Sequence, residues 1–299
     1  MFTPAFERFV AAARRKPQLW RLLVGLVIVM AVYVGWFAAV IAVGFLVLSA
    51  VQPGFDPAAL MEADTPLAVL VVLATFVGLA AGPIVAAAAL HDRSARSVVG
   101  APLRRPFLLA GAIAAGVFAA NYLLLPMAFD PVSNTPWSVW LPLLPVAVVG
   151  LLIQTGAEEV AFRGYLQTQL AARFRSPWVW MVLPSVVFGL MHLDPAGQGP
   201  NAWWIVAATT LFGLAAADLT RVTGSIGAAW GFHFANNFAA LLILGLDGAL
   251  SGLARWTTPF GADDVETLRP LMVQDMLVTV IVWALIRLAL AKPKRSVSG

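Results

Sequence analysis

Two neighbouring carboxylates occur in the stretch TGAEEVAFRG, where the other residues are mostly apolar. Glu159 precedes Arg163 by four residues, which places both side chains on one helix face in the favourable order of acid before base. We therefore expect Glu159 and Arg163 to form a structural ion pair. Glu158 projects about 100° away around the helix, and this direction leaves its carboxylate free for other chemistry.

Two histidines and a carboxamide stand in equally apolar surroundings. His192 ends the stretch FGLMH, and the stretch HFANN begins with His233 and ends with Asn237. Residues four apart share a helix face, so His233 and Asn237 project together, and the ring of Phe188 can pack beside the His192 imidazole. The third histidine, His91, lies in the basic stretch HDRSAR and is expected to be solvated.

These residue types suit the hydrolysis of an amide bond. A buried carboxylate beside an imidazole can deprotonate water, because burial raises the pKa of a carboxyl group towards neutrality. A histidine can share the role of base or protonate a leaving amine, and a carboxamide with an imidazole N–H can stabilise an oxyanion. The same Glu158, His192 and His233 could instead bind Zn²⁺ with an open water position. The residue types alone leave both chemistries open.

The elements that must position these residues are membrane spans. Of the 299 residues, 61% are hydrophobic and 11% are charged, whereas soluble domains carry about 25% charged residues. The composition therefore predicts an all-α, polytopic helical bundle in a single membrane-embedded domain, residues 1–299. The chain has no cysteine, which excludes disulfides, thiolate metal sites and a cysteine nucleophile.

A membrane-spanning helix needs roughly 20 predominantly apolar residues, and eight stretches meet this requirement. The start of the fourth is the least well defined, because WSVWLPLLP (137–145) can serve as an interfacial entry bent by its prolines. The predicted spans are about 22–48, 66–90, 106–129, 143–166, 177–193, 202–220, 225–246 and 271–291.

The basic residues fall almost entirely in alternate loops, and this bias predicts that both termini are cytoplasmic. Only Arg255 and Arg269 fall in predicted outer loops. Retention of basic loops on the inner face also explains the sequence pI of about 10.0 without nucleic acid as a partner. The inner basic residues are Arg8, Arg14, Arg15, Lys16, Arg21, Arg93, Arg96, Arg104, Arg105, Arg173, Arg175, Arg221, Lys292, Lys294 and Arg295.

The polar residues inside the spans are predicted to lie at similar depths. At 1.5 Å per residue, Glu158, His192 and His233 lie about 22, 25 and 18 Å along their helices from the nearest inner basic residue. Three separate spans therefore place them in one slab about 7 Å thick. Ionisable residues inside a membrane usually face the bundle interior and mark function, so we expect these side chains to meet around one wet cavity.

Three motifs in this order resemble a known family. EEVAFR (158–163) matches EExxxR, FGLMH (188–192) matches FxxxH, and HFANN (233–237) matches HxxxN. Together they resemble the CPBP family of intramembrane proteases, also called the CAAX-protease and bacteriocin-processing, or Abi, family, which includes the type II CAAX prenyl endopeptidase. The resemblance covers roughly 140–240, and the family's eight-span layout is similar as well.

The resemblance implies a catalytic core at about 140–246 and peptide-bond hydrolysis within the membrane. Family members have been described both as metalloproteases and as metal-independent glutamate proteases. We favour the metal-independent form, because Asn237 then acts as a donor, and zinc held by Glu158, His192 and His233 is the alternative. The implied roles are Glu158 as the water-activating residue, His192 as its assistant, His233 and Asn237 as the oxyanion hole, and Glu159 with Arg163 as structural support.

The expected substrate is a peptide or a membrane protein, and the expected location is the inner membrane of a bacterium, as the Ala-, Arg- and Gly-rich composition indicates. Two further classes stay open: a proton-coupled transporter, which would show inverted repeats or paired broken helices, and a non-catalytic immunity or scaffold protein. Motifs of other intramembrane proteases (HExxH, GxGD and GxSxG) are absent from the sequence.

Other polar residues in the spans are expected to have structural roles. Gln154 and Asn236 are predicted to form hydrogen bonds within the bundle. Asp218 is predicted to pair with Arg221 at the inner edge of the membrane, since the two lie three residues apart.

Overall fold

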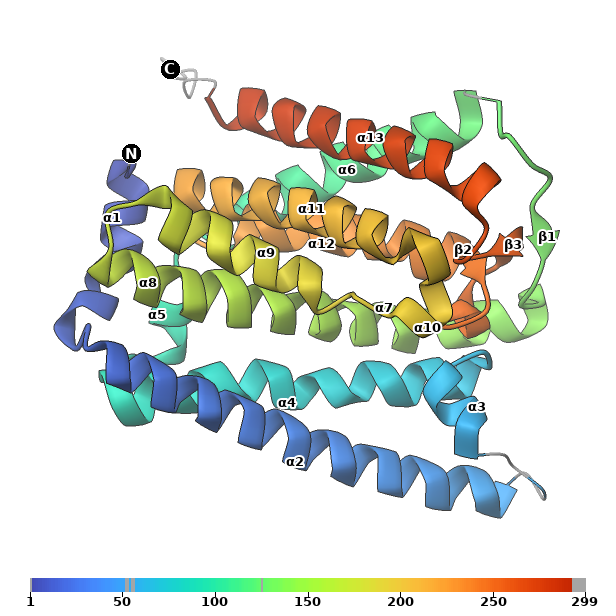
Figure 1. Ribbon diagram of the computed structural model, residues 1–299, viewed down its shortest axis with the longest axis horizontal. Helices are drawn as coiled ribbons and strands as arrows, with labels where there is room; N and C mark the ends of the chain where they lie inside the picture. The colour runs from blue at the N-terminus through green and yellow to red at the C-terminus, as the bar shows by residue number, and fades with distance from the viewer. Residues whose placement is uncertain (1, 52–53, 55–56, 125, 292–299) are drawn as a thin grey trace, which may run out of the picture.

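The computed structural model describes residues 2–51, 54, 57–124 and 126–291. Six helical stretches in this part of the chain are long and apolar enough to cross a membrane, which confirms the predicted all-α, polytopic bundle (Figure 1). They are α2 (Leu19–Val51), α4 (Pro66–His91), α6 (Arg104–Leu124), the continuous stretch Trp137–Arg173, the stretch Pro195–Thr223 and α13 (Val265–Ala291).

Two of these stretches contain several segments. The first consists of α7 (Trp137–Glu159), the π-helix η2 (Val160–Gln167) and α8 (Thr168–Arg173). The second consists of α10 (Pro195–Gln198), η4 (Gly199–Asn201) and α11 (Ala202–Thr223).

The fifth and seventh predicted spans form shorter helices. The range 177–193 contains the π-helix η3 (Trp178–Val182) and α9 (Leu183–Leu190), and the range 225–246 contains α12 (Gly227–Phe238) and the π-helix η5 (Ala239–Ile243). Neither segment is among the helices that are long and apolar enough to cross a membrane. That these two segments cross the membrane, for a total of eight spans, therefore stays a prediction.

The fourth span starts earlier than predicted. Its helix begins at Trp137 and runs through Pro142 and Pro145, so WSVWLPLLP is helix and not a bent entry. A proline in a helix removes one backbone hydrogen bond, but membrane helices tolerate this where neighbouring elements stabilise them. Here Trp140 is buried and donates its Nε1–H to the carbonyl of Leu242, at 3.0 Å.

The remaining elements are short and connect the long helices. They are α1 (Pro4–Ala11), η1 (Ala13–Arg15), α3 (Pro57–Glu62), α5 (Ala95–Val99), η6 (Ser251–Leu253) and three strands, β1 (Val132–Ser133), β2 (Leu244–Asp247) and β3 (Trp256–Gly261). The strands form one sheet in the order β1-β3-β2, antiparallel at the first junction and parallel at the second. The alternating hydrophobic spans did not predict this small sheet.

The segments with most of the basic residues meet at one end of the bundle, which we call the basic end. Arg21 donates to the carbonyl of Leu90, at 2.9 Å, and Ser225 donates to the carbonyl of Pro102, at 2.6 Å. Figure 1 shows α1, α5 and α8 at this end, together with the last turns of α11 and α13. The predicted alternation of basic loops is therefore present among the described residues, and Lys292, Lys294 and Arg295 lie outside them.

The sheet, α3 and α10 lie at the opposite end (Figure 1). Arg255, an exception to the charge alternation, is buried there, and its guanidinium lies 4.7 Å from the ring centroids of both Trp137 and Trp256. It also donates to Ser133 Oγ, at 2.9 Å. Its position away from the basic end is therefore explained by a structural contact that links the sheet to α7.

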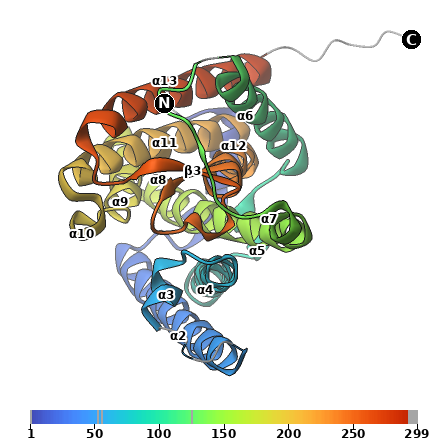
Figure 2. The ribbon, with the colours of Figure 1, turned by 90° about the vertical axis from the view of Figure 1, so that its right-hand side faces the viewer.

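His91 is not solvated as the sequence suggested. Only 1% of its surface is exposed, Nδ1 lies 3.0 Å from the carbonyl of Lys16, and Nε2 lies 3.0 Å from the hydroxyl of Tyr165. The reason is that α1, α2 and η2 close over the end of α4, which a linear sequence does not reveal. Seen along the bundle in Figure 2, α2 and α4 form a pair on one side, α7 and α9 lie next to it, and α11, α12, α6 and α13 lie beyond.

Candidate active site

The two neighbouring glutamates lie where one long helix changes its geometry. α7 ends at Glu159 and η2, with its wider turns, begins at Val160. Such π-segments inside α-helices are frequently found at functional sites. Both carboxylates are buried, with Glu158 9% and Glu159 0% exposed. Each therefore needs donors from neighbouring helices to offset the loss of water.

The two glutamates bracket one imidazole. Glu159 Oε1 lies 2.8 Å from Nδ1 of His233, and Glu158 Oε2 lies 3.5 Å from Nε2 of the same ring. His233 is itself buried, on α12. The short contact places the Nδ1–H on the side of Glu159, because a carboxylate oxygen accepts. The longer contact is not a hydrogen bond in this structure, so His233 Nε2 faces Glu158 Oε2 without satisfying it.

Glu159 forms the predicted ion pair and one more contact. Arg163 Nη1 lies 3.1 Å from Glu159 Oε1, which confirms the pair. Arg163 also donates to the carbonyl of Gly213 on α11, at 3.3 Å, and its guanidinium lies 4.5 Å from the ring centroid of Phe188 on α9. The sequence did not predict a second partner for Glu159, which the crossing of α12 supplies by bringing His233 to the same oxygen. Glu159 and Arg163 thus link α7–η2 to α9, α11 and α12.

Gln154 bridges two of the predicted site residues. Its Nε2 donates to Glu158 Oε1, at 2.7 Å, and its Oε1 accepts from Nδ2 of Asn237, at 2.9 Å. The sequence interpretation assigned Gln154 a general role in the bundle and missed this position in the site. The available signal was its place four residues before Glu158, on the same helix face. Asn236 makes the predicted bond within the bundle, to Oδ1 of Asn237, at 3.2 Å.

One oxygen of Glu158 is free of hydrogen bonds. Within the part of the chain that the structure describes, the buried atom Glu158 Oε2 has no hydrogen-bond partner, and neither has Glu159 Oε2. Leaving a buried acceptor unsatisfied costs about 1–3 kcal/mol. The expectation that Glu158 is free therefore holds for Oε2 but not for Oε1, which Gln154 occupies.

His192 lies apart from the other predicted site residues. α9 ends at Leu190, and the Nδ1–H of His192, in the turn that follows, donates to the carbonyl of Phe188, at 2.9 Å. Its ring packs 4.9 Å from that of Phe188, as predicted, and Phe188 lies 6.0 Å from the His233 ring on its other side. In the described residues, no hydrogen bond or ion pair joins His192 to Glu158.

The three residues of the zinc alternative are not gathered as a metal site in the described part of the chain. Three-ligand zinc requires Glu158, His192 and His233 to converge on one point. Among the described residues, no group of three or more histidine, aspartate or glutamate side chains is arranged to hold a metal ion. His233 presents both ring nitrogens to carboxylates, and His192 lies beyond the Phe188 ring.

The arrangement can move a proton and polarise a carbonyl group. Glu158 Oε2 offers an unsatisfied acceptor for a water proton, and His233 Nε2 lies 3.5 Å away to share it. Asn237 supplies an amide donor on the same face of α12, currently directed at Gln154. A substrate carbonyl would have to replace Gln154 as the acceptor for this N–H.

Two comparisons with known proteins match this part of the chain. Residues 136–239, from α7 to the first residue of η5, match the family model described as type II CAAX prenyl endopeptidase Rce1-like. The uncharacterized protein YyaK of Bacillus subtilis (strain 168) is 30% identical over 121 residues, a match that spans 40% of this chain and 40% of that protein. The family match contains Gln154, both glutamates, Arg163, both site histidines and Asn237. Through this segment, the chain is related to the CAAX-protease family that includes the Rce1-like type II CAAX prenyl endopeptidases.

Proposed function

We propose that this protein is an intramembrane endopeptidase that hydrolyses a peptide bond in a membrane-associated peptide or protein. The observation that carries the proposal is the buried, unsatisfied Oε2 of Glu158 beside His233. A carboxylate in a low-dielectric site that lacks a donor is a strong acceptor for a proton of water. The relation to a protease family supports peptide-bond hydrolysis as the reaction in which this acceptor takes part.

In the proposed reaction, Glu158 takes a proton from water, and the water oxygen forms a bond to the carbonyl carbon of the substrate. The electron pair of the C=O bond moves to the oxygen, and the Nδ2–H of Asn237 stabilises the resulting negative charge. The C–N bond then breaks, and the proton held between Glu158 and His233 is transferred to the leaving nitrogen.

The remaining residues of the site position Glu158, His233 and Asn237 or balance a charge next to them. Glu159 positions His233 through Nδ1, and Arg163 balances the charge of Glu159. Gln154 positions Glu158 and Asn237 before substrate binds. The Nδ1–H of His192 is used by the carbonyl of Phe188, which leaves Nε2 as the ring nitrogen available to assist Glu158.

The test of the proposal is peptide cleavage by the purified full chain in lipid nanodiscs, measured with a quenched fluorescent peptide library. We expect cleavage by the wild type and none above background by Glu158→Gln. Glu62→Gln, which changes an exposed glutamate on α3, is the matched control and should cleave normally. Cleavage by Glu158→Gln at the wild-type rate would refute the assignment.

The metal question needs a separate measurement. The proposed metal-free mechanism predicts full activity after dialysis against a chelator. Elemental analysis should then find less than about one zinc ion per ten protein molecules, which is roughly background for a site that would bind zinc with nanomolar affinity or tighter. Activity that disappears with the metal and returns with added zinc would support the alternative, in which Glu158, His192 and His233 move together to bind the ion.

We also propose that the basic end faces the cytoplasm of a bacterial cell. The lack of native cysteine allows this to be tested with single substitutions. Arg173→Cys lies at the basic end and Asp263→Cys at the opposite end, and both positions are exposed. In intact cells, a membrane-impermeant maleimide should label Asp263→Cys alone, and the reverse pattern would show that the chain is inverted.

A further inference from the structure

An apolar cavity lies between α6 and the face of α12 that points away from the candidate active site. Its volume is about 890 Å³, and its lining includes Phe107, Ala115 and Tyr122 of α6, Phe234 and Phe238 of α12, and Trp256 of β3. At 100° per residue, the lining positions of α12 are centred about 125° from the direction of His233 and Asn237. The cavity is therefore separated from the candidate active site by the body of α12.

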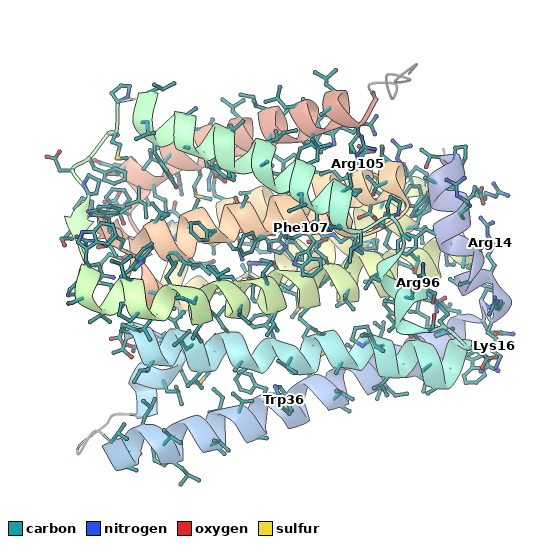
Figure 3. All side chains as sticks on the ribbon, turned by 180° about the vertical axis from the view of Figure 1, so that it is seen from behind. Arg14, Lys16, Trp36, Arg96, Arg105 and Phe107 are labelled. Atoms are coloured by element: carbon teal, nitrogen blue, oxygen red, sulfur yellow. The ribbon has the colours of Figure 1, made fainter. Side chains whose placement is uncertain are left out.

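The way in which α6 and α12 cross explains why the cavity exists. Gly231 allows close contact near the basic end, since a Cβ atom there would collide with the carbonyl oxygen of Phe107. Beyond this crossing the ribbons of α6 and α12 diverge, as Figure 3 shows from behind, with Phe107 labelled near the crossing. The lining positions of α6 after the crossing include Ala112, Ala115 and Ala119, whose methyl groups are too small to fill the space.

The dimensions of the cavity favour lipid chains over a peptide helix. The lining of α6 extends from Phe107 to Leu123, about 24 Å along the helix axis. A helix of this length would be about 10 Å in diameter with its side chains. An acyl chain is thinner, has no backbone polar groups to satisfy, and gains free energy for each methylene that it buries.

Exposed arginines lie at the basic end of the cavity. Arg104 and Arg105 begin α6, directly before the lining residues Phe107 and Leu108, and Arg96 is exposed on the neighbouring α5. Figure 3 labels Arg96, Arg105 and Phe107 in this region. None of the three arginines has an ion pair among the residues that the structure describes. Basic groups next to an opening between membrane helices bind the head groups of anionic lipids.

We propose that this cavity binds an anionic phospholipid. One acyl chain of the lipid lies along α6 and α12, and Arg104 and Arg105 hold its phosphate. The lipid would pack against Phe234 and Phe238, one helix away from His233. It is a bound lipid of the scaffold and not the substrate, so the proposal stands whether or not the protein is a protease.

The first test uses native mass spectrometry of the purified full chain in detergent, with dioleoylphosphatidylglycerol and dioleoylphosphatidylcholine as probes. The anionic lipid should bind at least tenfold more tightly. Arg104→Gln/Arg105→Gln should weaken its binding about thirtyfold at low salt and leave the zwitterionic lipid unchanged. Arg173→Gln/Arg175→Gln, which removes two exposed arginines of the basic end outside the cavity lining, is the control and should retain the preference.

The second test fills the cavity. Ala115→Trp should weaken the binding of both lipids at least tenfold, whereas Ala120→Trp, on the same helix and equally exposed but outside the lining, should not. Ala119→Leu, a smaller change in the lining, covers the case in which the tryptophan variant fails to fold. Glycerol 3-phosphate alone should not compete. Equal binding of the two lipids, or unchanged binding in both filled variants, would overturn the proposal.

Discussion

Two buried acidic clusters lie in this bundle, and they differ in how fully their oxygens are satisfied. At Asp218 on α11, Oδ1 accepts from Nε and Nη2 of Arg221, and Oδ2 accepts from Nε1 of Trp283 and Nη1 of Arg287. In the cluster of Glu158, Glu159 and His233, each carboxylate retains one oxygen without a hydrogen bond in the described part of the chain.

The difference separates a structural acid from a chemically available one. The donors around Asp218 join α11 to α13 near the basic end and leave no acceptor for a substrate or water. The predicted pairing of Asp218 with Arg221 is confirmed, at 2.6 Å, and Arg287 adds a partner from a distant part of the sequence. At Glu158, the fold instead retains an unsatisfied oxygen beside an imidazole that can share its proton. Burial alone therefore does not separate the two clusters, whereas the number of donors around their oxygens does.

The difference between the two clusters is tested most directly by removing the charge from Glu158. Glu158→Gln should lower the turnover number by about 10²–10⁴-fold, the range for a general base, with little change in thermal stability, because the amide keeps the shape of the side chain. Peptide cleavage and thermal unfolding of the same preparation measure both. If the variant loses thermal stability together with activity, Glu158 belongs with Asp218 among the structural acids.

The second largest effect is expected on stability, at Glu159. Glu159→Gln leaves the guanidinium of Arg163 buried without its counter-charge, a loss of about 3–5 kcal/mol in the free energy of unfolding. Replacing both partners, as Glu159→Gln/Arg163→Met, should recover most of this loss because no buried charge remains. Unfolding in a mixed-detergent titration measures the difference. If the double variant is no more stable than the single one, the ion pair is not what holds this crossing together.

A smaller and purely structural effect is expected at Asp218. Asp218→Asn keeps acceptor capacity on one atom and weakens the contacts of Arg221 and Arg287, whose side chains are 20% and 34% exposed. Partial solvation should limit the loss to about 1–2 kcal/mol. The turnover number should stay within about twofold of the wild type, since Asp218 touches none of the proposed catalytic residues. A large loss of turnover with unchanged stability would contradict the structural role.

The smallest effects separate two glutamines that donate side-chain hydrogen bonds inside the bundle. Gln274→Leu removes only a hydrogen bond to Asn121, at 3.0 Å, and should cost about 0.6 kcal/mol of stability with unchanged turnover. Gln154→Leu should cost a similar amount but lower the turnover number about tenfold, because Glu158 and Asn237 lose the group that positions them. Gln154→Glu, which retains an acceptor for Asn237, distinguishes the two contacts. Equal turnover in both leucine variants would assign Gln154 to the bundle only.

The sequence predicted some contacts of the candidate site residues and missed others. The order of motifs, the ion pair of Glu159 with Arg163, and the packing of Phe188 on His192 follow from local spacing, and the structure contains both contacts. The direct partnership of His192 with Glu158 is absent, because His192 lies in a turn after the end of α9. Equal depth in the membrane brings residues to one level but does not bring their side chains into contact.

Errors in the fold have a similar cause. The periodicity of apolar residues found the long helices, but it did not show that Pro142 and Pro145 lie within α7, that His91 is buried, or that a small sheet forms around β3. Each depends on a partner far along the chain: Leu242 for Trp140, Tyr165 for His91, and Val132 for Thr257.

The sequence by itself determined that the chain lies in a membrane, which segments form long helices, and which rare polar residues lie within them, because hydrophobic length and helical spacing are local properties. Only the tertiary structure decided that His233 lies between two carboxylates, that Gln154 holds both Glu158 and Asn237, and that one oxygen of Glu158 stays unsatisfied. The physical reason is that a hydrogen bond is directional and short. The crossing of α12 with α7 and the wider turns of η2 therefore determine which atoms pair.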